Sequence, residues 1–256
     1  MNATGSRDAF GVIMMPLWNR VRGGLVETVY PKTCAGCGLR GTWLCDPCEG
    51  SVPRLDTGIC FRCGGPVQAT CRSCVQLDRS IRLARAAYPY MGWVSNALRS
   101  FKYTDEWSRA DHLASMIVPS LNVFGEIDAI VPVPLHASKL RKRGYNQSEL
   151  LAQSLAKSTG VPTMPLLVRT RETAAQVDLS REDRHENVAG AFTIGPDWSP
   201  AAGGRFLLLD DVRTTSATLN ACASALLRSG PRSIVAATLA FDIPSKELQT
   251  WLDERR

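Results

Sequence analysis

From residue 81 onward, the order of apolar and polar positions predicts strands and helices in alternation. Short apolar runs predict strands at Arg85 to Tyr90, Ala129 to Val133, Arg205 to Leu209 and Ser233 to Phe241. Longer segments with apolar residues on one face predict helices at Val94 to Phe101, Arg109 to Leu121, Asn146 to Ser158 and Thr215 to Arg228. This α/β alternation predicts a parallel sheet with flanking helices, in which ligands bind at the carboxyl ends of the strands.

Before residue 81, cysteine rather than apolar periodicity dominates the chain. Eight of the nine cysteines lie between residues 34 and 74, and Cys222 stands alone in the C-terminal half. The eight form two copies of Cys-x2-Cys-x7-Cys-x2-Cys, which are Cys34, Cys37, Cys45 and Cys48, and then Cys60, Cys63, Cys71 and Cys74. Four thiolates at such spacing are typical of a closed structural Zn²⁺ site, so we expect two structural zinc ions.

The spacing leaves open which cysteines share an ion. Pairing within each repeat gives two stacked ribbons, whereas pairing Cys34 and Cys37 with Cys60 and Cys63 gives a crossed arrangement. A disulfide framework is the alternative to zinc. The segment from Ala9 to Trp18 contains a proline and lacks a small-residue cleavage site, so we expect no secretory signal and a cytoplasmic location, where disulfides are disfavoured.

Length, composition and charge set wider limits. A chain of 256 residues with 45% apolar content can form one medium domain and a small module. We expect an N-terminal helical segment at 1–29, a double zinc ribbon at 30–80, an α/β domain at 81–245 and a C-terminal tail at 246–256. No run approaches the roughly 18 apolar residues that span a bilayer, so no membrane insertion is expected. The net charge of +6 permits contact with phosphate or nucleic acid but requires neither.

The clearest candidate chemistry follows the apolar run that ends at Leu209. Two acids come first and hydroxyl residues then open a helix: Asp210, Asp211, Thr214, Thr215, Ser216, Ala217 and Thr218. Backbone N–H groups at a helix start lack intrahelical partners and carry the positive end of the dipole, so this turn suits a phosphate. The carboxylates can accept hydrogen bonds from ribose hydroxyls and assist a hydrated Mg²⁺. Simple helix capping is the alternative.

A second candidate is the basic segment after the strand that ends near Val133. It carries Arg141, Lys142 and Arg143 before Gly144, with no acid among them. Its place after a strand end favours a loop that binds pyrophosphate, with bidentate arginines and a lysine acting as a point charge. A solvated basic loop is the alternative. Residues 169–192 are polar and weakly periodic, which suits either a hood closing over a ligand or an ordinary surface loop.

The segment from Leu207 to Thr218 resembles the signature of type I phosphoribosyltransferases, in which two acids and a Thr-Thr-Gly-x-Thr turn hold phosphoribosyl pyrophosphate. Ser216 replaces the usual glycine, which matters if the turn needs a positive φ. Together with Pro-Val-Pro-Leu, Arg-Gly-Tyr-Asn-Gln, the hood and the paired cysteine motifs, it resembles the ComF family of competence-associated proteins from about residue 30 to residue 243.

The resemblance implies a double zinc ribbon before a type I phosphoribosyltransferase-like domain. It places phosphoribosyl pyrophosphate with Mg²⁺ on Asp210, Asp211 and the turn from Thr214 to Thr218, with the pyrophosphate near Arg141 to Gly144. The hood residues would be Gln176, Arg181, Arg184 and Asn187.

Three functions stay open. One is transfer of the phosphoribosyl group to an unidentified nucleobase-like or amine acceptor, with no recognisable general acid or base. The alternative is non-enzymatic handling of single-stranded DNA with DNA-uptake proteins, in which the zinc ribbons and the basic loop contact the strand. The third is a zinc-stabilised scaffold for other uptake proteins.

Overall fold

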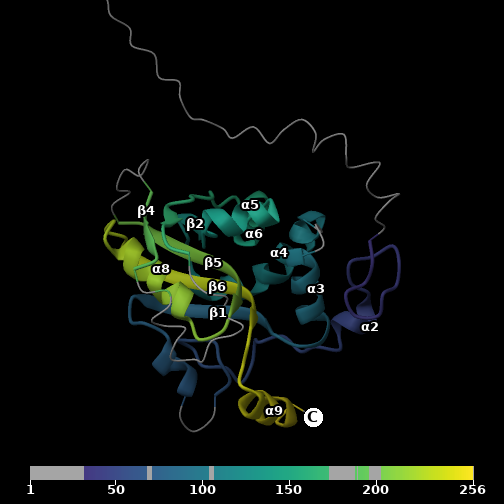
Figure 1. The fold of residues 1–256 in the computed structure, drawn as a ribbon. Helices are drawn as coiled ribbons and strands as arrows, with labels where there is room; N and C mark the ends of the chain where they lie inside the picture. The colour runs from purple at the N-terminus through teal and green to yellow at the C-terminus, as the bar shows by residue number, and fades with distance from the viewer. Residues whose placement is uncertain are drawn as a thin grey trace, which may run out of the picture.

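The computed structural model describes residues 32–67, 71–103, 107–172, 188, 190–195 and 203–255 (Figure 1). The helical segment expected at 1–29 lies outside these residues. Four parallel strands form the main sheet in the order β1-β6-β5-β2. Their bounds are β1 Ile81–Pro89, β2 Ala129–Pro132, β5 Arg205–Arg213 and β6 Ser233–Phe241. The expected parallel sheet with flanking helices is confirmed.

Helices cover both faces of this sheet, because the inner strands are apolar on both sides. Leu207 and Leu209 of β5 pack with the helices α3 and α6, whereas Leu208 packs with α8 on the other face. The helices are α3 Gly92–Tyr103, η2 Trp107–Arg109, α4 Ala110–Ile117, η3 Val118–Phe124, α6 Gln147–Thr159 and α8 Ala217–Leu227. No helix in the described ranges combines the length and the apolar character needed to cross a bilayer.

Two segments differ from expectation. The basic segment is not a loop but the helix α5 Ala137–Arg143, because the His136 side chain caps its start and Gly144 ends it in the left-handed conformation with φ 82°. The residues expected only as a C-terminal tail form α9 Ser245–Asp253, whose Trp251 is buried against Leu55 and Ile243. A small antiparallel pair, β3 Leu167–Arg169 and β4 Phe192–Ile194, flanks the hood segment.

The cysteine-rich segment contains two structurally equivalent units. We define the first cysteine repeat as residues 33–52 and the second as residues 59–78. The isolated bridge between Thr33 and Arg40 recurs between Ile59 and Pro66. The only regular elements in these repeats are α2 Asp46–Glu49 and η1 Arg72–Gln76, within the described residues. The internal repeat in the sequence is therefore also a repeat in structure.

The two repeats pack on different parts of the α/β domain. Cys34, Leu44 and Val52 of the first repeat share a core with α3, whereas Cys63 and Leu77 of the second share a core with β5 and α8. The second repeat thus lies against the elements that carry the acidic pair and the turn.

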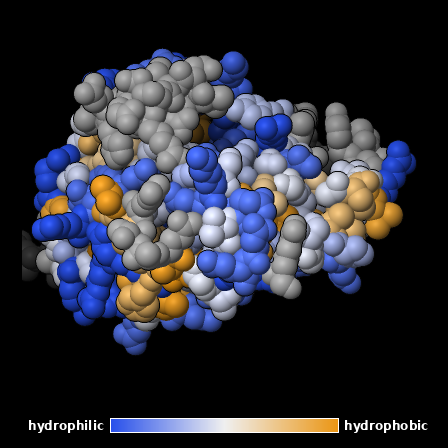
Figure 2. Space-filling view, turned by 90° about the horizontal axis from the view of Figure 1, so that it is seen from below, coloured by the Kyte–Doolittle hydropathy of each residue, from blue (hydrophilic) through white to orange (hydrophobic). Residues whose placement is uncertain are grey.

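Figure 2 shows that hydrophobic areas on the lower face are small and separated by hydrophilic ones.

Candidate functional site

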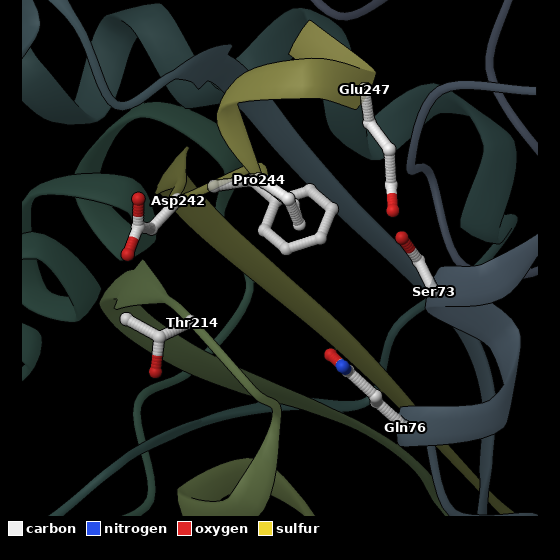
Figure 3. A pocket seen from close by; sticks show the side chains of 7 residues that line it. Ser73, Gln76, Thr214, Asp242, Pro244 and Glu247 are labelled. Carbon is white, nitrogen blue, oxygen red and sulfur yellow. The ribbon is translucent and has the colours of Figure 1, made fainter. Parts of the chain in front are cut away.

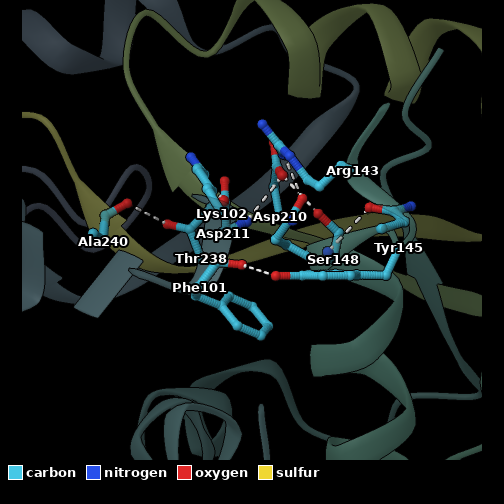
Figure 4. A network of polar contacts seen from close by, with 11 residues as sticks. Phe101, Lys102, Arg143, Tyr145, Ser148, Asp210, Asp211, Thr238 and Ala240 are labelled. Carbon is cyan, nitrogen blue, oxygen red and sulfur yellow. Dashed lines mark hydrogen bonds and ion pairs between the residues drawn. The ribbon is translucent and has the colours of Figure 1, made fainter. Parts of the chain in front are cut away.

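The acidic pair lies inside β5 rather than beyond its end. The strand was expected to end at Leu209, but the ladder with β6 continues from Asp210 to Arg213. Ser148 Oγ donates a hydrogen bond of 2.8 Å to Asp210 Oδ1, and the Asp211 amide donates one of 2.9 Å to the same oxygen. Lys102 Nζ lies 2.8 Å from Asp211 Oδ2, at the end of α3 (Figure 4). The pair is therefore held by α6 and α3 in addition to its own strand.

The two carboxyl groups differ from ordinary surface acids. Burial raises the pKa of Asp210 to about 7, and the charge of Asp211 acts in the same direction. Burial also lowers the pKa of Lys102, but the charge and hydrogen bond of Asp211 outweigh it, so that pKa is raised overall. Lys102 therefore stays cationic and compensates Asp211, whereas Asp210 titrates near neutral pH.

The start of α6 completes this network. Asn146 caps the helix by accepting from the Ser148 amide, and its Nδ2 donates to the Val133 carbonyl at 3.0 Å. Arg143 Nη1 donates to Gln147 Oε1 at 2.6 Å. Gln147 Nε2 is buried without a hydrogen-bond partner in the described part of the chain. An unpaired buried donor beside the acidic pair suits an anionic or hydroxylated ligand.

Sequence reasoning missed Lys102 and Ser148. Neither has a local signal, because Lys102 is one cation at a helix end and Ser148 is an ordinary residue in a first helical turn. The parallel sheet brings them to Asp210 and Asp211.

The turn between β5 and α8 has the backbone geometry that the glycine in the related signature suggested. Ser216 has φ 63° and ψ 2°. Among the described residues, it is the one residue other than glycine that has a positive φ. Thr215 is 2% exposed, and its Oγ1 has no hydrogen-bond partner within the described chain. A left-handed residue at the helix start and a buried unpaired hydroxyl are both costly, and such features cluster at functional turns.

We predict that Ser216→Gly stabilises the protein. A left-handed conformation costs an L residue about 1–2 kcal/mol, and part of this gain is offset by the entropy of an unfolded glycine, so about 0.5–1 kcal/mol should remain. Equilibrium denaturation by urea measures the change. Ser216→Ala is the control, since it removes the hydroxyl but keeps the strain. A glycine variant less stable than the alanine variant would contradict the prediction.

The remaining expected site residues are only partly brought together. Arg143 reaches the network through Gln147, whereas Arg141 and Lys142 are exposed in the last turn of α5. The expected hood residues Gln176, Arg181, Arg184 and Asn187 lie outside the described residues. At the edge of the hood, Ser138 Oγ donates to Glu172 Oε1 at 2.5 Å.

The eight clustered cysteines form two four-sulfur sites, each within one repeat. The sulfurs of Cys34, Cys37, Cys45 and Cys48 lie within 4.8 Å of one another, and so do those of Cys60, Cys63, Cys71 and Cys74. Four of the sulfur pairs, two in each cluster, lie 3.3 to 3.7 Å apart. Zn–S bonds of about 2.3 Å in a tetrahedron put sulfurs about 3.8 Å apart, whereas a disulfide needs about 2.05 Å. Each cluster could therefore hold one zinc ion, and of the two arrangements that the spacing leaves open the structure has the one within each repeat.

Side chains of the α/β domain tie each repeat to it. Arg213 follows the acidic pair, is 3% exposed and donates to the Cys63 carbonyl at 2.5 Å. Asn220 of α8 donates to the Gln76 carbonyl at 2.8 Å and accepts from the Asp78 amide at 3.0 Å. The second repeat is thus hydrogen-bonded to β5 before the turn and to α8 after it.

The first repeat is held elsewhere in the domain. Arg109 donates to the Trp43 and Thr33 carbonyls at 3.0 and 3.2 Å, and Asn96 of α3 donates to the Ala35 carbonyl at 3.1 Å. The Asn96 contact holds the first repeat to α3, which carries Lys102, and the Arg109 contacts hold it to η2; none of them involves the turn.

Comparison with known proteins gives curated relatives but no matching family model. Competence protein F of Haemophilus influenzae is 28% identical over 201 residues, which cover 75% of this chain and 87% of that protein. Competence protein ComFC of Bacillus subtilis is 26% identical over 207 residues, covering 76% and 82%. DNA utilization protein YhgH of Escherichia coli K12 is 28% identical over 205 residues, covering 76% and 88%.

Solved structures similar to this chain include phosphoribosyltransferases. An adenine phosphoribosyltransferase is 14% identical with a TM-score of 0.36, covering 60% of this chain and 80% of that one. The glutamine phosphoribosylpyrophosphate amidotransferase from B. subtilis is 19% identical with a TM-score of 0.35, covering 51% and 26%. Over about three quarters of its length, the chain is thus a homologue of curated competence and DNA utilization proteins, which confirms its resemblance to the ComF family.

Proposed function

We propose that this chain binds phosphoribosyl pyrophosphate with Mg²⁺ at the carboxyl ends of β2 and β5. The observation that carries the proposal is the acidic pair, half-buried Asp210 and buried Asp211, followed by the left-handed turn at Ser216 and the start of α8. Carboxylates suit ribose hydroxyls and a hydrated Mg²⁺, and a helix start suits a phosphate. The order of the carboxylates and then the helix start along the chain therefore matches the order of the ribose and the 5-phosphate in the ligand.

Each part of the ligand has its own partners in this proposal. The 5-phosphate lies on the turn from Thr214 to Thr218, and the ribose lies on the acidic pair. The pyrophosphate lies near the start of α6 and the end of α5, where Arg143 gives a bidentate contact. Bound Mg²⁺ would offset the charge of the pyrophosphate. Transfer would need no protein nucleophile, because the acceptor attacks the anomeric carbon and pyrophosphate leaves.

Calorimetry with Mg²⁺-phosphoribosyl pyrophosphate tests the binding proposal. We expect binding that weakens when Mg²⁺ is omitted, and weaker binding of ribose 5-phosphate or pyrophosphate alone, since each fills only part of the site. A pyrophosphate-release assay across bases and amines then tests transfer. Absence of binding up to about 1 mM ligand, a Kd that corresponds to only about 4 kcal/mol, would overturn the proposal.

We also propose that residues 30–80 form a double zinc ribbon that supports a domain at 81–245. Two structural zinc ions, one for each four-cysteine cluster, fit the sulfur geometry. Reduced thiols in such clusters suit a reducing compartment, so we propose a cytoplasmic location.

A second candidate function is the handling of single-stranded DNA. It is favoured by the names of the relatives, which are competence and DNA utilization proteins, and by the exposed cations Arg141 and Lys142 on α5. Fluorescence anisotropy with a labelled oligonucleotide should show binding that falls steeply with salt. Absence of binding at low salt would exclude this function.

The contacts of Asn220 give a prediction that tests the link between the second repeat and the turn. Asn220→Ala removes two hydrogen bonds between α8 and this repeat, so the turn loses support and affinity for Mg²⁺-phosphoribosyl pyrophosphate should fall about 5-fold, or about 1 kcal/mol. Asn96→Ala is the matched control, because it removes one such bond to the first repeat. Calorimetry of both variants measures the difference. Equal affinities would show that the second repeat does not position the turn.

A further inference from the structure

Two buried arginines lie against the four-cysteine cluster of the second repeat, which we call the second cluster. Arg213 of β5 is 3% exposed and Arg85 of β1 is 6% exposed. Arg213 donates to the Cys63 carbonyl at 2.5 Å. A Cβ added at Gly64 would lie 3.5 Å from Arg85 Cδ, so Arg85 packs against the same knuckle. Two strands of the sheet thus each bring one guanidinium group to this cluster.

Neither guanidinium group has a carboxylate as its partner. In the described part of the chain, no Asp or Glu forms an ion pair with Arg213 or Arg85. Nε and Nη2 of Arg213 are buried there without a hydrogen-bond partner. The guanidinium of Arg213 lies 3.7 Å from the ring centre of Phe241, and that of Arg85 lies 5.6 Å from the ring centre of Phe61. An aromatic ring attracts a cation but carries no net negative charge.

Water does not replace the missing partners. A hollow open to solvent lies beside this contact, and Figure 3 shows Ser73, Thr214 and Asp242 in its walls. Thr214 directly follows Arg213 in the chain, yet neither arginine is among the residues that line the hollow. The two positive charges are therefore enclosed by protein, where an uncompensated charge is strongly unfavourable.

The negative groups that act on these arginines are cysteine sulfurs. Burial lowers the pKa of Arg213 to about 10, and charged sulfurs of the second cluster oppose this shift. Burial also lowers the pKa of Arg85, and sulfurs of the same cluster oppose it. The sulfurs are those of Cys63, Cys71 and Cys74 for Arg213, and those of Cys60 and Cys63 for Arg85. Between them, the two arginines thus face all four sulfurs of the second cluster.

A zinc ion on four thiolates has the charge that these arginines lack. One Zn²⁺ with four thiolates is a dianion, and Arg85 and Arg213 together supply two positive charges. Four neutral thiols or two disulfides would leave both cations buried without a counter-charge. The burial of the arginines therefore favours zinc over a disulfide framework in the second repeat, independently of the distances between the sulfurs.

We propose that Arg85 and Arg213 are the counter-cations of a zinc site in the second cluster and that they strengthen its hold on the metal. The inference rests on the proposed zinc ions. An empty site takes up protons on its thiols and becomes neutral, whereas the loaded site is a dianion. Buried positive charge beside the sulfurs therefore stabilises the loaded site relative to the empty one.

Competition with the chromogenic chelator pyridylazoresorcinol tests this inference on the reduced, full-length chain. Arg213→Met keeps the apolar bulk but removes the charge, so one of the two zinc ions should transfer to the chelator at a concentration at least about 10-fold lower. Arg213→Lys keeps the charge on a different group, so transfer should stay within about threefold of the wild type. The zinc ion of the first repeat serves as the internal reference and should not change.

The second arginine and a matched control complete the experiment. Arg85→Met and Arg85→Lys repeat the comparison from β1, so the test does not depend on the folding of an Arg213 variant. Arg54→Met is the control, because Arg54 also stacks on an aromatic ring, that of Tyr88 at 4.7 Å. It donates to Tyr88 Oη and to the Met116 carbonyl, both at 2.7 Å. Its loss should leave both zinc affinities within about twofold.

The outcomes separate this inference from the proposed zinc sites. Two zinc ions whose affinities are unchanged in both methionine variants would overturn the inference and leave the zinc sites intact. Equal weakening of both ions, or equal weakening by methionine and lysine, would also overturn it, since charge at the second cluster explains neither result. A wild-type chain without zinc would overturn the zinc sites as well, whereas calorimetry still tests the phosphoribosyl pyrophosphate proposal.

Discussion

Replacing Cys63 and Cys74 with serine is expected to remove one of two zinc ions from each chain and to unfold the second cysteine repeat. This repeat has little regular structure, and Cys63 is completely buried. In small zinc modules, metal binding supplies about 10–16 kcal/mol of folding free energy, which the few apolar contacts of this repeat cannot replace. The effect should therefore be the largest of any substitution considered.

Metal analysis of reduced protein by mass spectrometry measures this effect, with two zinc ions per chain expected in the wild type and one in the variant. Cys222→Ala is the control, because Cys222 is buried in α8 outside both clusters and should leave the zinc content unchanged. A wild-type chain with well under one zinc ion would contradict the assignment of both clusters.

The second large effect is expected at the acidic pair. Asp210→Asn with Asp211→Asn should weaken binding of Mg²⁺-phosphoribosyl pyrophosphate by about 10-fold or more, because charge-assisted hydrogen bonds to the ribose and support of the Mg²⁺ shell are lost. The double variant also leaves Lys102 without its anionic partner. Asp210→Asn alone keeps the ion pair between Lys102 and Asp211. Comparing the ligand affinities of the single and the double variant therefore separates the loss of ligand contacts from the effect of an unpaired Lys102 charge.

The raised pKa of Asp210 also predicts in which direction ligand affinity changes with pH. A carboxyl group with a pKa of about 7 is mostly neutral below that value and mostly charged above it. Affinity of the wild type should therefore rise between about pH 6 and about pH 8, and the rise should be smaller in Asp210→Asn. Calorimetry at both pH values measures it. Unchanged affinity in the double variant would contradict the role of the pair in ligand binding.

Much of the fold could be predicted from the sequence because the signals are local. The two cysteine repeats follow from a spacing that recurs after 26 residues, as the equivalent bridges at Thr33 and Ile59 illustrate. The apolar run before Asp210 and the hydroxyl residues after Asp211 predict a strand, a turn and a helix start. The left-handed conformation of Ser216 is consistent with the glycine that the related signature has at this position, although the sequence indicated it only as a condition.

The residues around this segment could not be predicted in the same way. Ser148 is 62 residues from Asp210, and Arg213 is 150 residues from Cys63, yet each pair is hydrogen-bonded. The basic segment was expected as a loop because its run of charges resembles a solvated segment. The His136 cap and the left-handed Gly144, which delimit the helix, were not recognised in the sequence. The pairing of cysteines within repeats likewise depended on how the chain folds back.

The sequence by itself thus determined the strand, the acidic pair, the hydroxyl turn and the cysteine spacing, because neighbouring residues encode each of them. Only the tertiary structure decided that Lys102 pairs with Asp211 and that the second repeat contacts the residues on both sides of the turn. These contacts join segments far apart in the chain. Their positions follow from the strand order of the parallel sheet and from the packing of the repeats, which no local pattern records.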